Sequence, residues 1–332
     1  MNKSSILEVA KLAGVSPSTV SRVTNNRSIV KEATRIKVEE AMQKLGYTPN
    51  SAAQSLSSKR TNTIGMVVAM LDGPFYGPMI SGVESTLRKQ GKHLLIASGS
   101  GSAEGEEEAV EFLLNRQVDG LILLTEWLDR RYLKELEKRV PFYMINQHHD
   151  SLDHRVMWLD DVEGAYNATK YLINKGHTKI ACISGQEFKT DANDRVLGYK
   201  KALKEANIPV LDDMIVRTSF EVSGGLQGME QLKANGVEFT AVFAGNDESA
   251  IGVLTWANQH NVSVPAQLSV IGYDDILLSQ HVTPPLTTMH APNFEMAKSC
   301  AEKAFNEIYH KADPSGAKFV TTLIERSSVK AI

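Results

Sequence analysis

The sequence predicts an α/β protein in which two doubly wound lobes follow a small all-α head. Residues 5–26 hold two short amphipathic segments on either side of a glycine. From about residue 61 onward, apolar strand-like runs alternate with amphipathic helical runs, as in parallel α/β sheets. This body of about 270 residues is too long for a single sheet of that kind, so two lobes are expected.

The first two predicted helices of the head flank a tight turn at Gly14. The first runs from Ile6 to Ala13, where apolar residues recur at helical spacing. Ser5 precedes Glu8 by three residues, which is the spacing of a capping box. These local signals predict a short helix with a defined beginning and end.

The second helix is predicted to begin after Ser16, an N-cap residue, with Pro17 at its first position. Val20 and Val23 face inward. The residues left outward are Pro17, Ser18, Ser21, Arg22, Asn25 and Asn26. Two short helices with such a polar outer face form a helix-turn-helix, which reads DNA; a plain helical hairpin is the alternative.

Charge is divided unevenly between the head and the body. The chain has 36 basic and 39 acidic residues, yet residues 1–60 contain ten Lys or Arg against four Asp or Glu. The head therefore has a net charge of +6 and the remainder a net charge of −9. A basic head on an acidic body is expected if only the head meets a polyanion.

A third helix is predicted from about Glu32 to Leu45, ended by Gly46. Its expected core face consists of Ile36, Val38, Ala41, Met42 and Leu45. Asn50 can cap a final segment at residues 51–59, whose apolar content is too small for an isolated helix. Leu56 would then be exposed on a helix that forms only against a partner, as in wedges that kink the minor groove; an ordinary linker is the alternative.

Residues 5–60 resemble the DNA-binding head and hinge of the lac repressor/galactose repressor family, and the resemblance continues to the C-terminus. The motifs that carry it are Val9-Ala10, Ala13-Gly14-Val15-Ser16, Thr19-Val20-Ser21-Arg22-Val23, Gly46-Tyr47, Pro49-Asn50 and Ala53-x-x-Leu56. The resemblance implies a bacterial transcriptional repressor that binds a near-palindromic operator as a homodimer. One recognition helix would enter each major-groove half-site, and paired hinge helices would bind the central minor groove.

The resemblance also assigns roles to residues of the head. Three would read bases (Pro17, Ser18 and Arg22), two would contact phosphates (Ser21 and Asn25), and Leu56 would be the intercalating wedge. The full predicted DNA-binding set is Ser16, Pro17, Ser18, Thr19, Ser21, Arg22, Asn25, Asn50, Ala53 and Leu56. The chain departs from the family pattern at Pro17, which offers bases no hydrogen bond, and at Lys31, where a Ser often caps the third helix.

The expected elements of the body alternate along the chain. Predicted strands are 64–70, 93–97, 120–124, 142–145, 156–159, 179–184, 214–218, 241–244 and 269–273. Predicted helices include 79–90, 106–116, 162–175, 195–206, 224–234 and 248–260. The resemblance implies a body of the periplasmic-binding-protein type (type I), with two lobes hinged around a ligand cleft.

The resemblance further implies that the chain crosses between the lobes three times, near residues 160, 290 and 320. The predicted domains are a helix-turn-helix head at 1–48, a hinge and linker at 49–61 and an effector and dimerisation body at 62–332. Within the body, the first lobe holds about 62–160 and 292–320, and the second about 161–291 and 321–332. The dimer is expected to form through helices of the first lobe, residues 79–90 among them.

Ligands of open α/β sheets bind beyond the carboxyl ends of strands, so the polar and aromatic residues there form the candidate effector site. Carboxylates, amides, an Arg and aromatic faces together suit a sugar or a nucleoside. The candidates are Phe75, Tyr76, Asn146, Trp158, Asp191, Arg195, Phe220, Asn246 and Asp274, and Asp72 is left out. Arg195 is expected to begin the helix that follows the loop 186–194.

Enzyme classes find little support in the sequence. The glycines at 99, 101 and 105 do not have dinucleotide-loop spacing, and no Walker A sequence or nucleophile elbow is present. His148 and His149 lack a third ligand at metal-site spacing, so neither a metal nor a cofactor is expected. Two Cys, no signal peptide and no membrane-spanning apolar run indicate a reducing, cytoplasmic location, and the resemblance implies that the cytoplasm is bacterial.

The resulting hypothesis is a repressor whose operator affinity depends on a small ligand, most simply a sugar or glycoside, bound between two lobes. A nucleoside- or purine-responsive regulator of the same architecture is one alternative. A cytoplasmic sugar-binding module that merely keeps the head is the other. Sequence-specific DNA binding would exclude the module, and stacking aromatics with an edge-reading amide would favour the purine.

Overall fold

The computed structural model describes residues 4–24, 30–48, 60–146 and 152–332. The predicted contacts of Asn25, Asn50, Ala53 and Leu56 lie outside these residues, as do His148 and His149. By their internal contacts the residues form two units, one made of 1–63 with 117–119 and one of 64–116 with 120–332. No described helix is both long and apolar enough to cross a membrane.

The head contains the three predicted helices: α1 (Ile6–Ala13), α2 (Pro17–Thr24) and α3 (Glu32–Leu45). Its core is formed by Val9, Ala10, Val20, Val38 and Ala41. The capping box of α1 is complete, because the Ser5 hydroxyl accepts from the Glu8 amide and the Glu8 carboxylate accepts from the Ser5 amide. Gly14 and Gly46 end α1 and α3 in the left-handed conformation (φ 68° and 57°), which glycine adopts without strain.

One predicted core residue of the head is wrong. Ile36 is 46% exposed, whereas Val38 and Ala41 are buried. Residues 38, 41, 42 and 45 follow the i, i+3, i+4, i+7 pattern of one helix face. Residue 36 is two positions before Val38, so it points to the opposite side of α3.

Lobe 1 is built on a six-stranded sheet in the order β11-β5-β4-β3-β1-β2. Its strands are β1 (Thr63–Val68), β2 (His93–Ser98), β3 (Gly120–Leu124), β4 (Phe142–Ile145), β5 (Val156–Leu159) and β11 (Ala317–Phe319). Its helices are α5 (Tyr76–Lys89), α6 (Ala103–Asn115), α7 (Arg130–Glu137) and α12 (Asn293–His310). β3 pairs in parallel with β1 and β4, and β5 pairs in parallel with β4 and β11.

Lobe 2 is built on a second six-stranded sheet in the order β12-β10-β9-β8-β6-β7. Its strands are β6 (Ile180–Ser184), β7 (Ile215–Arg217), β8 (Ala241–Ala244), β9 (Ser269–Asp274), β10 (Thr287–His290) and β12 (Thr322–Ile324). Its helices are α8 (Asp161–Asn174), α9 (Thr190–Glu205), α10 (Val222–Ala234) and α11 (Asp247–Gln259). β12 runs antiparallel to β10, and the other pairings are parallel.

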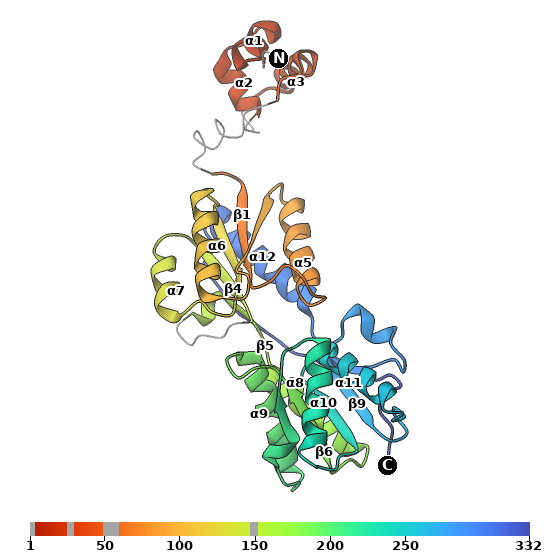
Figure 1. The fold of residues 1–332 in the computed structure, drawn as a ribbon. Helices are drawn as coiled ribbons and strands as arrows, with labels where there is room; N and C mark the ends of the chain where they lie inside the picture. Colours follow the sequence, from red (N-terminus) through yellow and green to blue (C-terminus); the bar gives the residue numbers. More distant parts are fainter. Residues whose placement is uncertain (1–3, 25–29, 49–59, 147–151) are drawn as a thin grey trace. The chain divides into compact units, whose positions relative to one another are not determined.

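The chain passes between the two sheets three times: between β5 and α8, between β10 and α12, and between β11 and β12. Figure 1 shows α12 beside α5 in lobe 1, although the two helices are more than 200 residues apart in the sequence. Their packing is close at Gly82, where an added Cβ would lie 2.6 Å from the Phe294 carbonyl oxygen.

Three strands were not predicted: β10, β11 and β12. β10 reads Thr-Thr-Met-His, and the other two have three residues each. Such short segments carry little hydrophobic periodicity, and they become strands because a neighbouring strand supplies their hydrogen bonds.

The predicted start of α9 is also wrong. This helix begins at Thr190, so Arg195 lies in its second turn and does not begin the helix.

Candidate functional site

A cavity of about 380 Å³ lies beyond the carboxyl ends of the strands and is lined by residues of both lobes. Lobe 1 contributes Met70, Asp72, Gly73, Phe75, Tyr76, Gly101, Glu126 and Trp127. Lobe 2 contributes Gln186, Phe188, Lys189, Asp191, Arg195, Ser219, Phe220, Glu221, Asn246, Glu248 and Asp274. The strand-end rule thus located a cavity of the size that small-molecule sites have.

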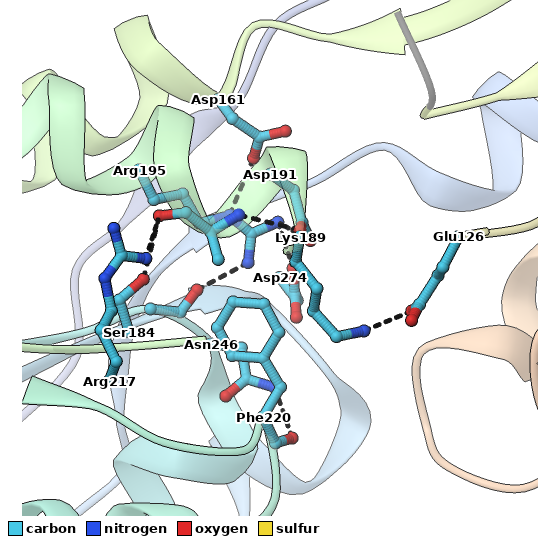
Figure 2. A network of polar contacts seen from close by, with 12 residues as sticks. Glu126, Asp161, Ser184, Lys189, Asp191, Arg195, Arg217, Phe220, Asn246 and Asp274 are labelled. Carbon is cyan, nitrogen blue, oxygen red and sulfur yellow. Dashed lines mark hydrogen bonds and ion pairs between the residues drawn. The ribbon is translucent and has the colours of Figure 1, made fainter. Parts of the chain in front are cut away.

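Arg195 is the centre of a buried ionic cluster on the lobe 2 side. Its Nε donates to Asp161 Oδ1 at 2.8 Å and its Nη1 donates to the Gly245 carbonyl at 2.6 Å. Its Nη2 lies 3.8 Å from Asp191 Oδ2 and 3.6 Å from Asp274 Oδ1 (Figure 2). The side chain is 2% exposed, so the guanidinium is held in one orientation by the groups that surround it.

The carboxylates of this cluster are held in an unusual electrostatic environment. Burial raises the pKa of Asp161 to about 6, against the opposing effect of Arg195. Burial also raises the pKa of Asp274, and Arg195 again opposes the shift. Asp274 is 6% exposed, and its Oδ1 accepts no hydrogen bond although it lies near Arg195. That oxygen has the capacity to accept a hydrogen bond from a ligand hydroxyl.

Asn246 has a structural task beside the cavity. As the N-cap of α11, its Oδ1 accepts from the Ser249 amide, and its Nδ2 donates to the Phe220 carbonyl at 2.9 Å. Both polar atoms of the amide are therefore used within the protein. Asn246 acts on the cavity by fixing the segment that carries Phe220, whose ring lies 5.4 Å from the Arg195 guanidinium carbon.

Asp247, the next residue, anchors the chain beneath the same wall. Its Oδ2 accepts from the Ile276 amide at 2.9 Å and the Ser279 hydroxyl at 2.5 Å, and its Oδ1 accepts from the Thr288 hydroxyl at 2.5 Å. Burial raises the pKa of Asp247 to about 6. This carboxylate ties α11 to the segment between β9 and β10 and to β10 itself.

The lobe 1 wall is mainly aromatic. Phe75 and Tyr76, at the start of α5, meet edge to face with ring centroids 5.3 Å apart. Trp127 of lobe 1 stacks on Phe188 of lobe 2 with centroids 4.4 Å apart and an interplanar angle of 23°. Lys189 and Glu126, the sequence neighbours of Phe188 and Trp127, form an ion pair across the lobes (Figure 2). The two lobes therefore meet directly at one edge of the cavity.

The loop that carries Glu126 and Trp127 is held by a buried carboxylate, Glu106 in α6. Glu106 is fully buried and accepts from the backbone amides of Glu126 (2.7 Å), Trp127 (2.8 Å) and Leu128 (3.1 Å). Burial raises the pKa of Glu106, and these hydrogen bonds act in the opposite direction. Three amides aimed at one side chain fix the position of the loop.

Seven of the nine predicted effector residues line the cavity: Phe75, Tyr76, Asp191, Arg195, Phe220, Asn246 and Asp274. Asn146 lines a second cavity of about 60 Å³ that shares Phe75, Tyr76 and Asp191 with the first. Trp158 lines neither; it lies in β5, with Lys318 Nζ 5.0 Å from its ring centroid. Trp158 is therefore removed from the candidate effector residues.

The prediction also missed lining residues, and the charged and aromatic ones among them are Asp72, Glu126, Trp127, Phe188, Lys189, Glu221 and Glu248. Glu126 and Trp127 directly follow β3, so the strand-end rule applied to that strand would have found them. Phe188 and Lys189 carry no such signal, because they belong to a loop whose path depends on the fold.

In the head, α2 presents the predicted base-reading side chains to solvent. Pro17, Ser18 and Arg22 are exposed, and Val20 on the opposite face is fully buried. Ser16 Oγ accepts from the Thr19 amide at 3.2 Å, as expected of an N-cap. Lys31 stands at the N-cap of α3 and makes no side-chain capping hydrogen bond, as its chemistry predicted.

Comparisons with known proteins identify the family to which this architecture belongs. Residues 5–50 match the family model of bacterial regulatory proteins of the lacI family, and residues 169–329 match the periplasmic binding protein-like domain. The HTH-type transcriptional regulator GalR of Salmonella typhimurium is 39% identical over 326 residues, which is 98% of this chain and 95% of that protein. The ribose operon repressor of Escherichia coli is 39% identical over 306 residues, covering 92% of each chain.

Other relatives and solved structures agree in architecture. The HTH-type transcriptional repressor PurR of Vibrio atlanticus is 35% identical over 330 residues, covering 98% of this chain and 99% of that protein. The lac repressor dimer bound to operator and an anti-inducer is 27% identical with a TM-score of 0.89, covering 99% of this chain and all of that chain. A complex of the regulator CelR with cellobiose is 29% identical with a TM-score of 0.74, covering 98% and all of the two chains. The chain belongs to the lacI family of bacterial regulatory proteins and is a helix-turn-helix transcriptional regulator.

Proposed function

We propose that this regulator is a homodimeric repressor whose affinity for a near-palindromic operator is controlled by a sugar or glycoside in the cavity between its lobes. The observation that carries the proposal is the cavity itself, where buried acceptors and an ordered Arg195 stand opposite aromatic rings. Sugars present hydroxyl donors at their edges and apolar C–H groups on their faces, and this lining suits both.

The proposed DNA-reading surface is the outer face of α2. Pro17 would contact bases by shape or apolar contact, and Ser18 and Arg22 by hydrogen bonds in the major groove. The net charge of +6 on residues 1–60 supports binding to phosphates. Leu56, predicted as the minor-groove wedge, lies outside the described residues, and its role rests on the sequence alone.

The proposed regulation is linkage between the cavity and the operator. A ligand that prefers one arrangement of the lobes changes the spacing of the two first lobes in the dimer, and with it the pairing of the hinge segments on DNA. A coupling free energy of about 1–3 kcal/mol would change operator affinity roughly 5–150-fold. Head 1–48, hinge 49–61 and body 62–332 are the proposed domains, and the bacterial cytoplasm is the proposed location.

A purine or nucleoside is the second candidate ligand. PurR is a relative over almost the whole chain, and five aromatic side chains line the cavity, which could stack on a base. The amide of Asn246 already makes two hydrogen bonds within the protein, which fix its orientation and leave it one N–H and one lone pair for a base. The buried carboxylates favour the sugar.

A thermal-shift titration against sugars, glycosides, nucleosides and purines tests the ligand class. A sugar at ~100 times its dissociation constant would stabilise the protein by ~2.7 kcal/mol and raise Tm with dose. A rise with purines alone would replace the sugar by the second candidate. Specific binding to a palindromic operator, measured against random DNA of equal length, excludes the sugar-binding module that only retains a head.

Asp274→Asn tests whether ligand response passes through this cavity. The variant removes one acceptor and keeps the shape of the side chain, so operator binding is expected to persist while the response to the sugar is lost. If Asp274→Asn responds to the sugar as the natural protein does, the proposed site is misplaced.

A further inference from the structure

The cavity carries six carboxylates and two cations among its lining residues. The acidic residues are Asp72, Glu126, Asp191, Glu221, Glu248 and Asp274. The cations are Lys189 and Arg195. This imbalance bears on the charge of any ligand that enters, because the cavity walls exclude much of the screening solvent.

Both cations already have protein partners. Lys189 pairs with Glu126, and both side chains are largely buried, with exposures of 20% and 26%. Arg195 donates to Asp161 and to the Gly245 carbonyl, and it lies within 4 Å of Asp191 and Asp274. Neither is available as a free cation to hold a phosphate or carboxylate of a ligand.

Three of the carboxylates remain without a cationic partner and form what we call the carboxylate rim: Asp72, Glu221 and Glu248. They come from the segment after β1, the N-cap of α10 and the first turn of α11. Among the described residues, none of the three forms an ion pair with a Lys, Arg or His. Burial raises the pKa of Glu248, and the charges of Glu221 and Asp72 raise it further.

A second observation, independent of the rim, concerns Asp274. Its Oδ1 is buried in the cavity wall and accepts no hydrogen bond, and the residue is 6% exposed. A buried carboxylate oxygen of this kind is satisfied by a donor from a ligand, such as a hydroxyl group. A ligand phosphate at the same place would bring acceptors toward an acceptor.

We propose that the carboxylate rim makes the cavity selective against anions, so that it admits uncharged polyhydroxylated ligands and rejects phosphorylated or carboxylated ones. The inference rests on the proposed function, since it concerns the ligand of the same cavity. Asp72, Glu221 and Glu248 are the specificity-determining residues. A ligand anion would meet three carboxylates that have no cationic partner in the described part of the chain and would be repelled, whereas a neutral hydroxyl donates to the same oxygens.

Matched pairs of ligands test the proposal by calorimetry on the full-length protein: galactose with galactose 1-phosphate, ribose with ribose 5-phosphate, cellobiose with cellobionate, and guanosine with guanosine monophosphate. For every pair in which one member binds, the anion is expected to bind at least about 100-fold more weakly than its neutral parent. An anion that binds as tightly as its parent overturns the proposal. The guanosine pair separates this test from the proposed sugar ligand. If guanosine binds and guanosine monophosphate does not, the selectivity against anions is supported even though the ligand is not a sugar.

Glu221→Gln/Glu248→Gln identifies the responsible residues. The ratio of the dissociation constants of the anion and its parent is expected to shrink by about 10-fold in this double variant. Glu108→Gln, which removes an exposed carboxylate of α6 that does not line the cavity, is the control and should leave the ratio unchanged. An unchanged ratio in the double variant overturns the assignment to the rim.

A measurement without ligand tests whether the carboxylates of the rim destabilise the free protein, even if none of these compounds binds. Burial and the charges of Glu221 and Asp72 disfavour the ionised form of Glu248, so Glu248→Gln is expected to raise Tm by about 1–3 °C, with Glu108→Gln near zero. A lower Tm for Glu248→Gln would mean that this carboxylate has favourable partners in the cavity, and the proposal would fail.

Discussion

The strands of the two lobes occupy corresponding positions, yet the halves of the cavity that the lobes build differ in kind. In the sheet orders β11-β5-β4-β3-β1-β2 and β12-β10-β9-β8-β6-β7, each strand of one lobe has a counterpart in the other. Lobe 2 places a buried ionic cluster around Arg195 at its strand ends. Lobe 1 places aromatic rings there, with Trp127 and Phe75 partly exposed.

The two halves of the cavity are also held in place in different ways. In lobe 2, two side chains that line the cavity are themselves hydrogen-bonded within the protein: Arg195 donates to Asp161, and Asn246 donates to the Phe220 carbonyl. In lobe 1, the loop after β3 depends on one buried side chain, Glu106, that binds its backbone. The same order of strands thus supports a buried ionic wall in one lobe and a mainly aromatic wall in the other.

The largest expected effect comes from Arg195→Ala. Removing the guanidinium leaves Asp161 and Asp274 as buried, unpaired carboxylates, so the free energy of unfolding should fall by about 3–5 kcal/mol in urea denaturation. Arg217→Ala is the control, because Arg217 also donates to backbone carbonyls but is only half-buried. A loss no larger than that of the control would show that the lobe 2 wall does not depend on this cluster.

Glu106→Gln, in lobe 1, should cause the next largest loss in the free energy of unfolding. The amide keeps one acceptor, but its NH₂ group faces a backbone amide, so at least one buried N–H loses its partner, at a cost of about 1–3 kcal/mol. The Trp127 emission spectrum should shift as the loop moves, while Glu108→Gln leaves it unchanged. An unaltered spectrum together with an unaltered Tm would mean that the loop is held by other contacts.

The pKa of Asp247 predicts a pH dependence that belongs to lobe 2. Its folded-state pKa of about 6 lies above the ordinary value of 3.8, so the folded protein takes up a proton before the unfolded chain does. This group should therefore add about 1.4 kcal/mol of stability as pH falls from 7 to 5. Asp247→Asn should remove that increment from the pH profile, and an identical slope in both proteins would contradict the assignment.

The smallest effect is expected where the lobes meet. Lys189→Met breaks the ion pair with Glu126 and should cost only about 0.5–1 kcal/mol, because both side chains retain some contact with solvent. Lys179→Met, which breaks an exposed pair within lobe 2, is the control and should cost less. A cost of several kcal/mol for Lys189→Met would mean that the two walls are one rigid unit.

Structural features that depend on only a few neighbouring residues could be predicted from the sequence. Ser5 and Glu8 predicted the start of α1, and the apolar runs of β3, β4, β5 and β8 predicted those strands with the bounds that the structure has. Strands buried on both faces are apolar throughout, so these short runs could be predicted without their partners, whereas the polar sequence of β10 could not. Ile36 was misplaced because an apolar residue was assigned to the core without testing its angle against Val38.

By itself, the sequence determined the two-part division of charge, the helix-turn-helix, the alternation of strands and helices, and most of the strand-end residues of the cavity. Those properties follow from helix caps, periodicity and the rule that ligands bind at strand ends. Only the tertiary structure decided that Trp158 lies away from the cavity, that Phe188 stacks on Trp127, and that Glu106 holds the loop between them. These outcomes depend on contacts between segments distant in the chain, and a pattern read along the sequence does not contain the geometry of such contacts.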